Sequence, residues 1–222
     1  ALNVVLEQGK TLPNAGAYQD YFRWVATGLE EPMTTHADRF KYNTGYGMSA
    51  YDKGSIFLSQ LQYVIGKENF DNTLKKYFDD WSFKHPKPND FIRSAEKVSG
   101  LELDWYLLDW AQSTMTIDYS VNSLYGVDNK TRIVLKRIGQ MGMPIDLRIK
   151  LKSGETLDYN IPMTKMRGSK PLQSSTLLKS WSWAKPYYEV WLDVDSKNIS
   201  KITIDPKNEM ADINRDNNYL VL

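Results

Sequence analysis

Residues 49–70 read SAYDKGSIFLSQLQYVIGKENF, and this stretch decides how the first half of the chain folds. After Tyr51, apolar side chains recur close to the period of an α-helix, about 3.6 residues. They are Ile56, Phe57, Leu61, Val64 and Ile65. Gly66 follows directly, and glycine commonly ends a helix because it adopts the left-handed conformation without strain. The stretch therefore predicts an amphipathic helix that starts at Tyr51 and ends at Gly66.

The same period continues on both sides of this helix. Residues 67–83 place one apolar face between lysines and aspartates; its members are Phe70, Leu74, Tyr77, Phe78 and Trp81. After the helix-breaking HPKPN segment, Asn89 is the expected N-cap of a helix over residues 90–100. Shorter helices are predicted over residues 103–112 and 15–28, with a loop over residues 29–44. The first half of the chain is therefore predicted to be all-helical.

The pattern changes after about Thr116. Five segments alternate apolar and polar side chains and are separated by Gly, Asn, Asp and Pro turn signals; they are residues 117–126, 130–139, 144–163, 187–195 and 199–205. Lys152-Ser153-Gly154-Glu155 reads as a hairpin turn within the third segment. About six or seven short strands at this spacing predict an immunoglobulin-like β-sandwich. We therefore expect an α+β chain with a helical domain over residues 1–116 and a β-sandwich domain over residues 117–222.

Composition narrows the class of function. The chain carries 28 Lys and Arg against 27 Asp and Glu, a net charge of +1, which gives no concentrated basic surface for nucleic acid. Cysteine is absent, which excludes disulfides, thiol nucleophiles and thiolate metal ligands. No apolar run has the roughly 20 residues of a membrane-spanning helix. Ala1–Lys10 does not read as a leader peptide, so an export signal would lie upstream and the localisation stays open.

No complete catalytic or metal-binding motif is present. A catalytic metal site needs about three protein ligands, whereas the only two histidines, His36 and His85, are far apart and are better explained as loop residues. Neither the GxSxG motif of serine hydrolases nor a phosphate-binding glycine motif occurs. Two acidic segments begin like calcium loops but lack required positions, and we interpret both as solvated turns. These segments contain Asp193, Asp195 and Asn198, and Asp212, Asn214 and Asp216.

The helix-forming stretch also carries a recognisable motif, Y-x-K-G followed by an apolar helix and G-x-x-x-F. Its members are Tyr51, Lys53, Gly54, Gly66 and Phe70. A second motif combines a Phe-bearing helix, Ser-Gly and an aromatic helix; it comprises Phe91, Ser99, Gly100, Leu103, Trp105, Tyr106 and Trp110. In this order the motifs resemble the aminopeptidase N-type zinc metallopeptidases, or gluzincins, over residues 40–125. The resemblance implies that the helical half is the C-terminal subdomain of a thermolysin-like catalytic domain, followed by a β-sandwich.

The resemblance also implies roles for two tyrosines. In such enzymes zinc, held by HExxH and a downstream Glu, activates a water, and a tyrosine at the position of Tyr51 donates a hydrogen bond to the oxyanion. A neutral phenol is a suitable donor to a developing alkoxide. Tyr46 matches a further tyrosine near this site in some members. The alternative is that Tyr51 is a buried aromatic that opens a helix. Lys53 and Gly54 are expected to be structural, with Gly54 allowing another helix to approach closely.

The family's HExxH motif, third zinc ligand and Gly-x-Met-x-Asn loop are all absent from this sequence. We expect them before Ala1, so that the chain is one part of a zinc aminopeptidase that cleaves peptides from their N-termini. Its partners would then be the missing part of the catalytic domain and the peptide substrate. Alone, the chain is expected to bind no zinc and to be inactive. The helix surface that faces the zinc helices would be exposed, which favours self-association.

A non-catalytic binding module is the alternative function. An aromatic run could present a platform for sugar or peptide on the sandwich; it contains Trp181, Trp183, Tyr187, Tyr188 and Trp191. Because alternate side chains of a strand point to opposite faces, about half of these rings are expected in the core. A flat, open aromatic surface would favour this function. A purely structural interaction protein, in turn, would show no cleft around Tyr51.

Overall fold

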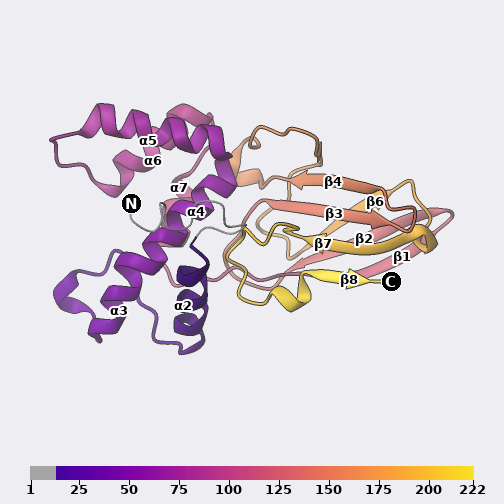
Figure 1. The fold of residues 1–222 in the computed structure, drawn as a ribbon, viewed down its shortest axis with the longest axis horizontal. Coiled ribbons are helices and arrows are strands. Elements are labelled where there is room, and N and C mark those ends of the chain that lie inside the picture. The colour runs from indigo at the N-terminus through magenta and orange to yellow at the C-terminus, as the bar shows by residue number, and fades with distance from the viewer. Residues whose placement is uncertain (1–13) are drawn as a thin grey trace. The chain divides into compact units, whose positions relative to one another are not determined.

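The computed structural model describes residues 14–222, which divide into two compact units (Figure 1). The helical unit ends at Met115 and also takes in Asn208–Ala211 from much later in the chain. The β-unit comprises Thr116–Lys207 and Asp212–Leu222. The predicted α+β order, helices followed by a β-sandwich, is confirmed. The late return of the chain to the helical unit has no counterpart in the sequence-based prediction.

The helical unit is built from α2 (Ala15–Ala26), α3 (Asn43–Gly47), α4 (Gly54–Ile65), α5 (Lys67–Trp81), α6 (Pro88–Ser99) and α7 (Asp104–Ala111). Two further turns are the 3₁₀ turn η1 (Ala37–Arg39) and the π-helical turn η2 (Met48–Lys53). The apolar stripe of α4 is buried, and its Phe57 packs against Tyr106 of α7 with ring centroids 5.1 Å apart. Tyr106 on α7 is fully buried, and its hydroxyl donates to the backbone oxygen of Phe57 on α4. The periodicity of residues 49–70 thus supplies one wall of the core.

Glycines end two of these helices as predicted. Gly66 and Gly100 follow α4 and α6 with φ angles of 84° and 72°, which a residue with a side chain rarely adopts. The predicted cap at Asn89 is wrong, because α6 begins at Pro88 and its N-cap is Lys87. Proline at the first helical position costs no hydrogen bond, and the Asp90 carboxylate accepts from the backbone N–H of Lys87 at 2.8 Å.

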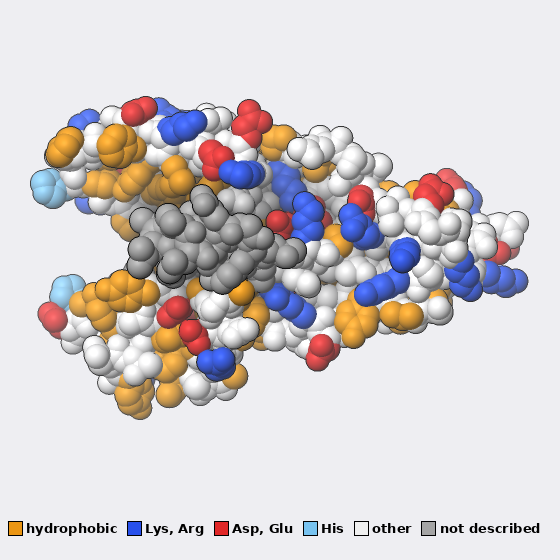
Figure 2. Space-filling view, in the orientation of Figure 1, with side chains coloured by type: hydrophobic (Ala, Val, Ile, Leu, Met, Phe, Trp, Pro, Cys, Tyr) orange, Lys and Arg blue, Asp and Glu red, His pale blue; other side chains and the backbone are white. Residues whose placement is uncertain are grey.

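The apolar face of α5 is covered only in part. Phe70 is buried, and Tyr77 packs edge-on against Phe91 of α6 with ring centroids 5.1 Å apart. In contrast, Leu74 is 41% exposed and Phe78 is 68% exposed. Figure 2 shows hydrophobic side chains gathered in the region of α5 and α6. Part of the predicted apolar face therefore remains on the surface.

Asn208–Ala211 is held in the helical unit by a buried amide. The fully buried Gln60 of α4 donates to the backbone oxygen of Glu209 at 2.8 Å and accepts from the backbone N–H of Ala211 at 3.0 Å. Tyr18 of α2 donates to the same Glu209 oxygen at 2.6 Å. A segment from the end of the chain thus completes a core that begins with α2.

The β-unit is a sandwich of two sheets. One sheet has the order β1-β2-β6 and is antiparallel, with β1 (Tyr119–Val127), β2 (Lys130–Arg137) and β6 (Tyr187–Leu192). The other has the order β5-β4-β3-β7-β8, with β3 (Ile145–Leu151), β4 (Thr156–Ile161), β5 (Thr176–Leu177), β7 (Ile199–Ile204) and β8 (Tyr219–Val221). The short β5 pairs in parallel with β4, whereas the other named strands of residues 14–222 pair antiparallel. The remaining 3₁₀ turns are η3 (Thr164–Met166), η4 (Ser196–Asn198) and η5 (Arg215–Asn217).

Alternation along the strands produces the sandwich core. Every second side chain of β2 and β3 is buried, including Ile133 and Leu135 on β2 and Ile145, Leu147 and Ile149 on β3. The hairpin between β3 and β4 turns at Gly154, whose φ of 93° requires glycine. None of the helices in residues 14–222 is long and apolar enough to cross a bilayer.

Candidate active site

Tyr51 lies on the surface of the helical unit, in the π-helical turn η2 between α3 and α4. Its side chain is 74% exposed, so the interpretation of Tyr51 as a buried aromatic is wrong. Tyr46 lies in the preceding α3 and is 40% exposed. Its ring packs edge-on against Phe40, with centroids 5.7 Å apart. Both predicted site tyrosines are therefore accessible from solvent.

The π-helical turn explains how one short segment exposes Tyr51 and buries its neighbours. Ser49 and Lys53 are the buried residues of η2, and Lys53 is only 2% exposed. Two residues apart on a helix lie on nearly opposite faces, so Lys53 points inward where Tyr51 points outward. Such turns are rare and occur often at functional sites.

The surroundings of Gly54 bear on the helix contact predicted for it. A Cβ built at Gly54 would meet only the backbone oxygen of Ser49 at 3.8 Å, which is ordinary van der Waals contact. Within residues 14–222, no other helix comes within 4 Å of this Cβ position.

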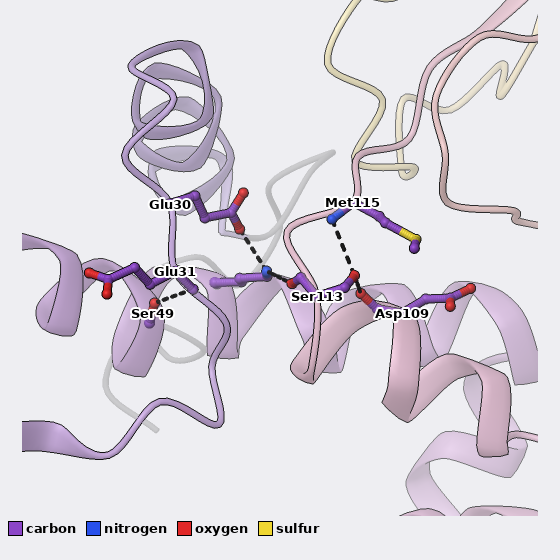
Figure 3. Close-up of polar contacts among 7 residues, drawn as sticks. Glu30, Glu31, Ser49, Asp109, Ser113 and Met115 are labelled. Atoms are coloured by element: carbon purple, nitrogen blue, oxygen red, sulfur yellow. Dashed lines mark hydrogen bonds and ion pairs between the residues drawn. The ribbon is translucent and has the colours of Figure 1, made fainter. Parts of the chain in front are cut away.

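Lys53 is the buried charge beneath Tyr51. Its ammonium forms an ion pair with Glu30, with Nζ and Oε1 2.6 Å apart, and both side chains are buried (Figure 3). The same ammonium donates to the backbone oxygen of Ser113 at 3.1 Å. A buried charge is tolerated only when it is paired and hydrogen-bonded. Lys53 meets this condition with partners from two distant segments of the chain.

The other end of η2 is held by the residue next to Glu30. The Ser49 hydroxyl donates to the backbone oxygen of Glu31 at 3.4 Å (Figure 3), and the Glu31 carboxylate accepts from the backbone N–H of Lys41 at 3.1 Å. The segment predicted as a loop over residues 29–44 therefore packs along η2. We refer to Glu30, Glu31, Ser49, Lys53 and Ser113 as the clamp.

The charges around the clamp affect neighbouring titratable groups. Burial, and then the negative charge of Glu30, raise the pKa of the Tyr21 phenol well above its ordinary value, so Tyr21 stays neutral. Burial raises the pKa of the Asp52 carboxyl, next to Tyr51, and the nearby Asp20 raises it further. The Lys53–Glu30 pair thus places one buried carboxylate close to a neutral phenol, while Asp52 and Asp20 add negative charge near the surface of η2.

The residues described here do not fit a zinc site. His36 caps η1, and its Nδ1 accepts from the backbone N–H of Asp38 at 3.3 Å. His85 is exposed, in the turn between α5 and α6. Between residues 14 and 222, no group of three or more His, Asp or Glu side chains is arranged to hold a metal ion. A zinc site would need ligands from outside residues 14–222.

The two calcium-like segments differ from each other. Asp193 pairs with Lys130 at 2.6 Å, and Asp195 caps η4, so the first segment is a solvated turn as predicted. The prediction is wrong for the second segment, because Asp212 is fully buried. Its carboxylate accepts from the backbone N–H groups of Tyr119 and Asn214, each at 2.9 Å. Asp212 therefore connects the start of β1, at Tyr119, with the turn at Asn214.

The aromatic run on the sandwich is divided between the core and the surface. Trp181 is buried against Tyr119 and Tyr188, whereas Trp183, Tyr187 and Trp191 are about half exposed. Each exposed ring has a cation beside it, from Lys165, Lys136 and Arg132 respectively. A cavity of about 10 Å³ beside Trp181 and Trp183 has room for roughly one water. One ring of the run is therefore in the core, and three remain partly open to solvent.

A helical unit with an exposed tyrosine on its Y-x-K-G turn, followed by a β-sandwich, is the architecture expected for the C-terminal part of an aminopeptidase-like metallopeptidase. Comparison with known proteins confirms this resemblance. Residues 17–110 match the family model described as the Peptidase family M1 domain.

Three curated relatives are similar to this chain over parts of its length. Tricorn protease-interacting factor F2 of Thermoplasma acidophilum is 27% identical over 48% of the chain and 14% of its own length. Aminopeptidase N of Escherichia coli is 25% identical over 32% of the chain and 8% of its own length. Rat glutamyl aminopeptidase is 31% identical over 37% of the chain and 8% of its own length. The chain therefore spans only a small part of each relative.

Among solved structures, aminopeptidase A of Legionella pneumophila, in a complex with aspartic acid, has a similar fold. The match has a TM-score of 0.52 and 16% sequence identity, and it covers 76% of this chain and 18% of that protein. At this identity the match supports the fold alone. It extends the similarity beyond the helical unit, because it covers more of the chain than residues 17–110.

Sequence reasoning missed the clamp beneath the candidate catalytic tyrosine. The sequence separates Glu30 from Lys53 by a segment without helical periodicity, and a lysine within a helix normally indicates the solvent face. The only available signal was the lysine of the Y-x-K-G motif, which was predicted to be structural. The structure gives this lysine a buried partner, the Glu30 carboxylate.

Proposed function

We propose that this chain is part of a zinc-dependent aminopeptidase that hydrolyses peptide bonds at peptide N-termini, and that it supplies Tyr51 as the oxyanion donor. The observation that supports this proposal is the position of Tyr51. Its phenol is exposed on a clamped π-helical turn, within the segment that matches the M1 domain. An oxyanion donor must reach the substrate and must not move during the reaction.

The chemistry assigned to Tyr51 is donation of one hydrogen bond. When the peptide carbonyl is attacked, negative charge develops on its oxygen, and a neutral phenol O–H can donate to it without transferring its proton. Zinc, when bound in the complete enzyme, would activate the attacking water. Because the described residues do not fit a zinc site, we assign its ligands and the amine-binding loop to the part of the catalytic domain outside this sequence. The chain alone is then inactive.

Substitution of Tyr51 in the complete enzyme tests this role. Tyr51→Phe removes only the hydroxyl, and we expect kcat for an aminoacyl chromogenic substrate to fall about a hundredfold or more while KM changes little. Tyr46→Phe is expected to have a smaller effect. Zinc content should be equal in all variants. Tyr125→Phe, at an exposed tyrosine of the sandwich, is the matched control and should keep wild-type turnover.

Two results would contradict the proposal. Wild-type turnover of Tyr51→Phe would show that the phenol does not stabilise the transition state. Tight zinc binding by these 222 residues alone, at one ion per chain by elemental analysis, would show that the metal ligands are not elsewhere.

A further inference from the structure

Lys53 is buried at a position where a lysine is costly. A lysine removed from water loses its hydration, and the lost hydration must be replaced by a partner charge and by hydrogen bonds. Glu30 at 2.6 Å supplies the charge, and the Ser113 backbone oxygen at 3.1 Å supplies a hydrogen bond. A leucine or methionine would fill the same core without this requirement. The ion pair therefore suggests a role other than filling space.

The clamp acts on the same turn that carries Tyr51. Ser49 and Lys53 lie on either side of Tyr51 in η2, and both point inward. They are held by adjacent residues of one segment, through the Glu31 backbone oxygen and the Glu30 carboxylate (Figure 3). A turn fixed on both sides of Tyr51 leaves its backbone little freedom. The direction of the exposed phenol is then set from the buried side.

The third partner anchors the clamp to the end of the last helix. Besides accepting from Lys53, Ser113 donates from its hydroxyl to the backbone oxygen of Asp109 on α7 and accepts from the backbone N–H of Met115 at 3.2 Å (Figure 3). Its carbonyl is thus held at a fixed place. Lys53 therefore joins η2 to the segments that contain Glu30 and Ser113. Each of these segments makes further hydrogen bonds of its own.

We propose that Lys53 is a positioning residue for the reaction: its contacts with Glu30 and Ser113 hold the π-helical turn so that the Tyr51 phenol meets the oxyanion. This proposal rests on the proposed function of Tyr51. Lys53 does not touch the substrate, and it acts only through the place of the phenol. A displacement of about 1 Å at a catalytic group can lower the rate about a hundredfold.

A double-mutant cycle in the complete enzyme tests this dependence. Lys53→Met removes the ammonium but keeps the volume, and Glu30→Gln removes the partner charge but keeps an oxygen acceptor. Each is measured alone and combined with Tyr51→Phe, for kcat and KM with an aminoacyl chromogenic substrate. Lys67→Met, which breaks an exposed ion pair with Asp71, is the matched control. Thermal unfolding and zinc content identify folded variants.

We expect Lys53→Met to lower kcat about 10- to 100-fold with little change in KM, and Glu30→Gln to lower it less. In the Tyr51→Phe background, either change should lower kcat further by less than about threefold, because the group that they position is already lost. If Lys53→Met does not fold, Glu30→Gln alone decides the question by the same comparison.

Multiplicative losses in the double variants would overturn the proposal, because Lys53 would then act independently of Tyr51. Wild-type kcat in folded Lys53→Met or Glu30→Gln would overturn it as well. These failures differ from failure of the proposed function, in which Tyr51→Phe alone leaves kcat unchanged.

Discussion

At the residue scale, two buried charged groups in this chain are stabilised in different ways. Lys53 has an opposite charge at 2.6 Å, whereas Asp212 accepts hydrogen bonds from the backbone N–H groups of Tyr119 and Asn214. Burial raises the pKa of Asp212 to about 7, and the neighbouring Asp118 adds to the increase, although these hydrogen bonds oppose it. Asp212 therefore titrates near neutral pH, far from the usual range of a carboxyl.

This shift predicts how stability depends on pH. The folded pKa of Asp212 lies above its ordinary value of 3.8, so the folded chain retains a proton that the unfolded chain has lost. The contribution of Asp212 to the free energy of unfolding is therefore full below about pH 4 and is lost as pH rises to about 7. In Asp212→Asn this group cannot titrate. We therefore compare the free energies of unfolding of wild type and Asp212→Asn, measured by urea unfolding. The value for wild type minus the value for Asp212→Asn should decrease as the pH rises from about 4 to about 7.

A constant difference between the two proteins across the same pH range would contradict this prediction. Asp193→Asn is the control, because it makes the same substitution at an exposed aspartate of the sandwich. For that variant the difference from wild type should change far less over this pH range than it does for Asp212→Asn.

At the scale of single elements, Gly16 and Gly100 occupy two different backbone conformations, one within a helix and one at a helix end. Gly100 ends α6 with a φ of 72°, where an alanine would be strained although no atom lies within 4 Å of its Cβ. Gly16 lies within α2, where a Cβ also meets none of residues 14–222 within 4 Å and φ is helical. Both positions therefore have room for a Cβ atom, and they differ in backbone conformation.

We accordingly predict opposite effects for the same substitution. Gly100→Ala should lower the free energy of unfolding by about 1 kcal/mol, because alanine does not favour positive φ. Gly16→Ala should raise it by about 0.5 kcal/mol, through helix propensity. Chemical denaturation of both variants measures the two changes, and a loss at Gly16 of the size seen at Gly100 would contradict the argument.

Most helices and strands could be predicted because each is indicated by a repeat of apolar side chains within a short stretch of sequence. The face of α4 and the alternation of β2 and β3 depend on side chains a few residues apart, and the resemblance of the Y-x-K-G motif led to Tyr51. The π-helical turn was missed because it changes the backbone within one turn and leaves no separate period. The clamp and the buried Asp212 were missed because their partners are distant in sequence, and a polar residue alone does not indicate burial.

At the scale of the whole molecule, the exposed part of the α5 face bears on whether the chain self-associates. Leu74 and Phe78 lie four residues apart on one helix face and are both exposed. In the proposed function the rest of the catalytic domain would cover part of this helix surface. In its absence we propose that two copies associate through Leu74 and Phe78, because contiguous exposed apolar surface favours association.

Phe78→Glu tests this association in the 222-residue chain. The charge disfavours burial of the face, so the variant should sediment as a monomer at concentrations of about 100 μM, at which we expect wild type to self-associate. Asn72→Glu adds the same charge at an exposed position of α5 and should behave as wild type does. A wild-type chain that sediments as a strict monomer at this concentration would refute the proposal.

The return of Asn208–Ala211 to the helical unit has a consequence for biosynthesis. Gln60 is separated by 149 residues from Glu209 and by 151 from Ala211, its two backbone partners. The ribosome therefore delivers α2 and α4 long before the segment that satisfies Gln60, and nearly all of the sandwich emerges in between. Contacts so far apart in sequence form late, and domains made in sequence usually fold as they emerge. In this chain most of the helical unit is translated before the sandwich, but it cannot be completed until residues 208–211 have been made. A translation product that stops before residue 208 would leave Gln60 without these two partners.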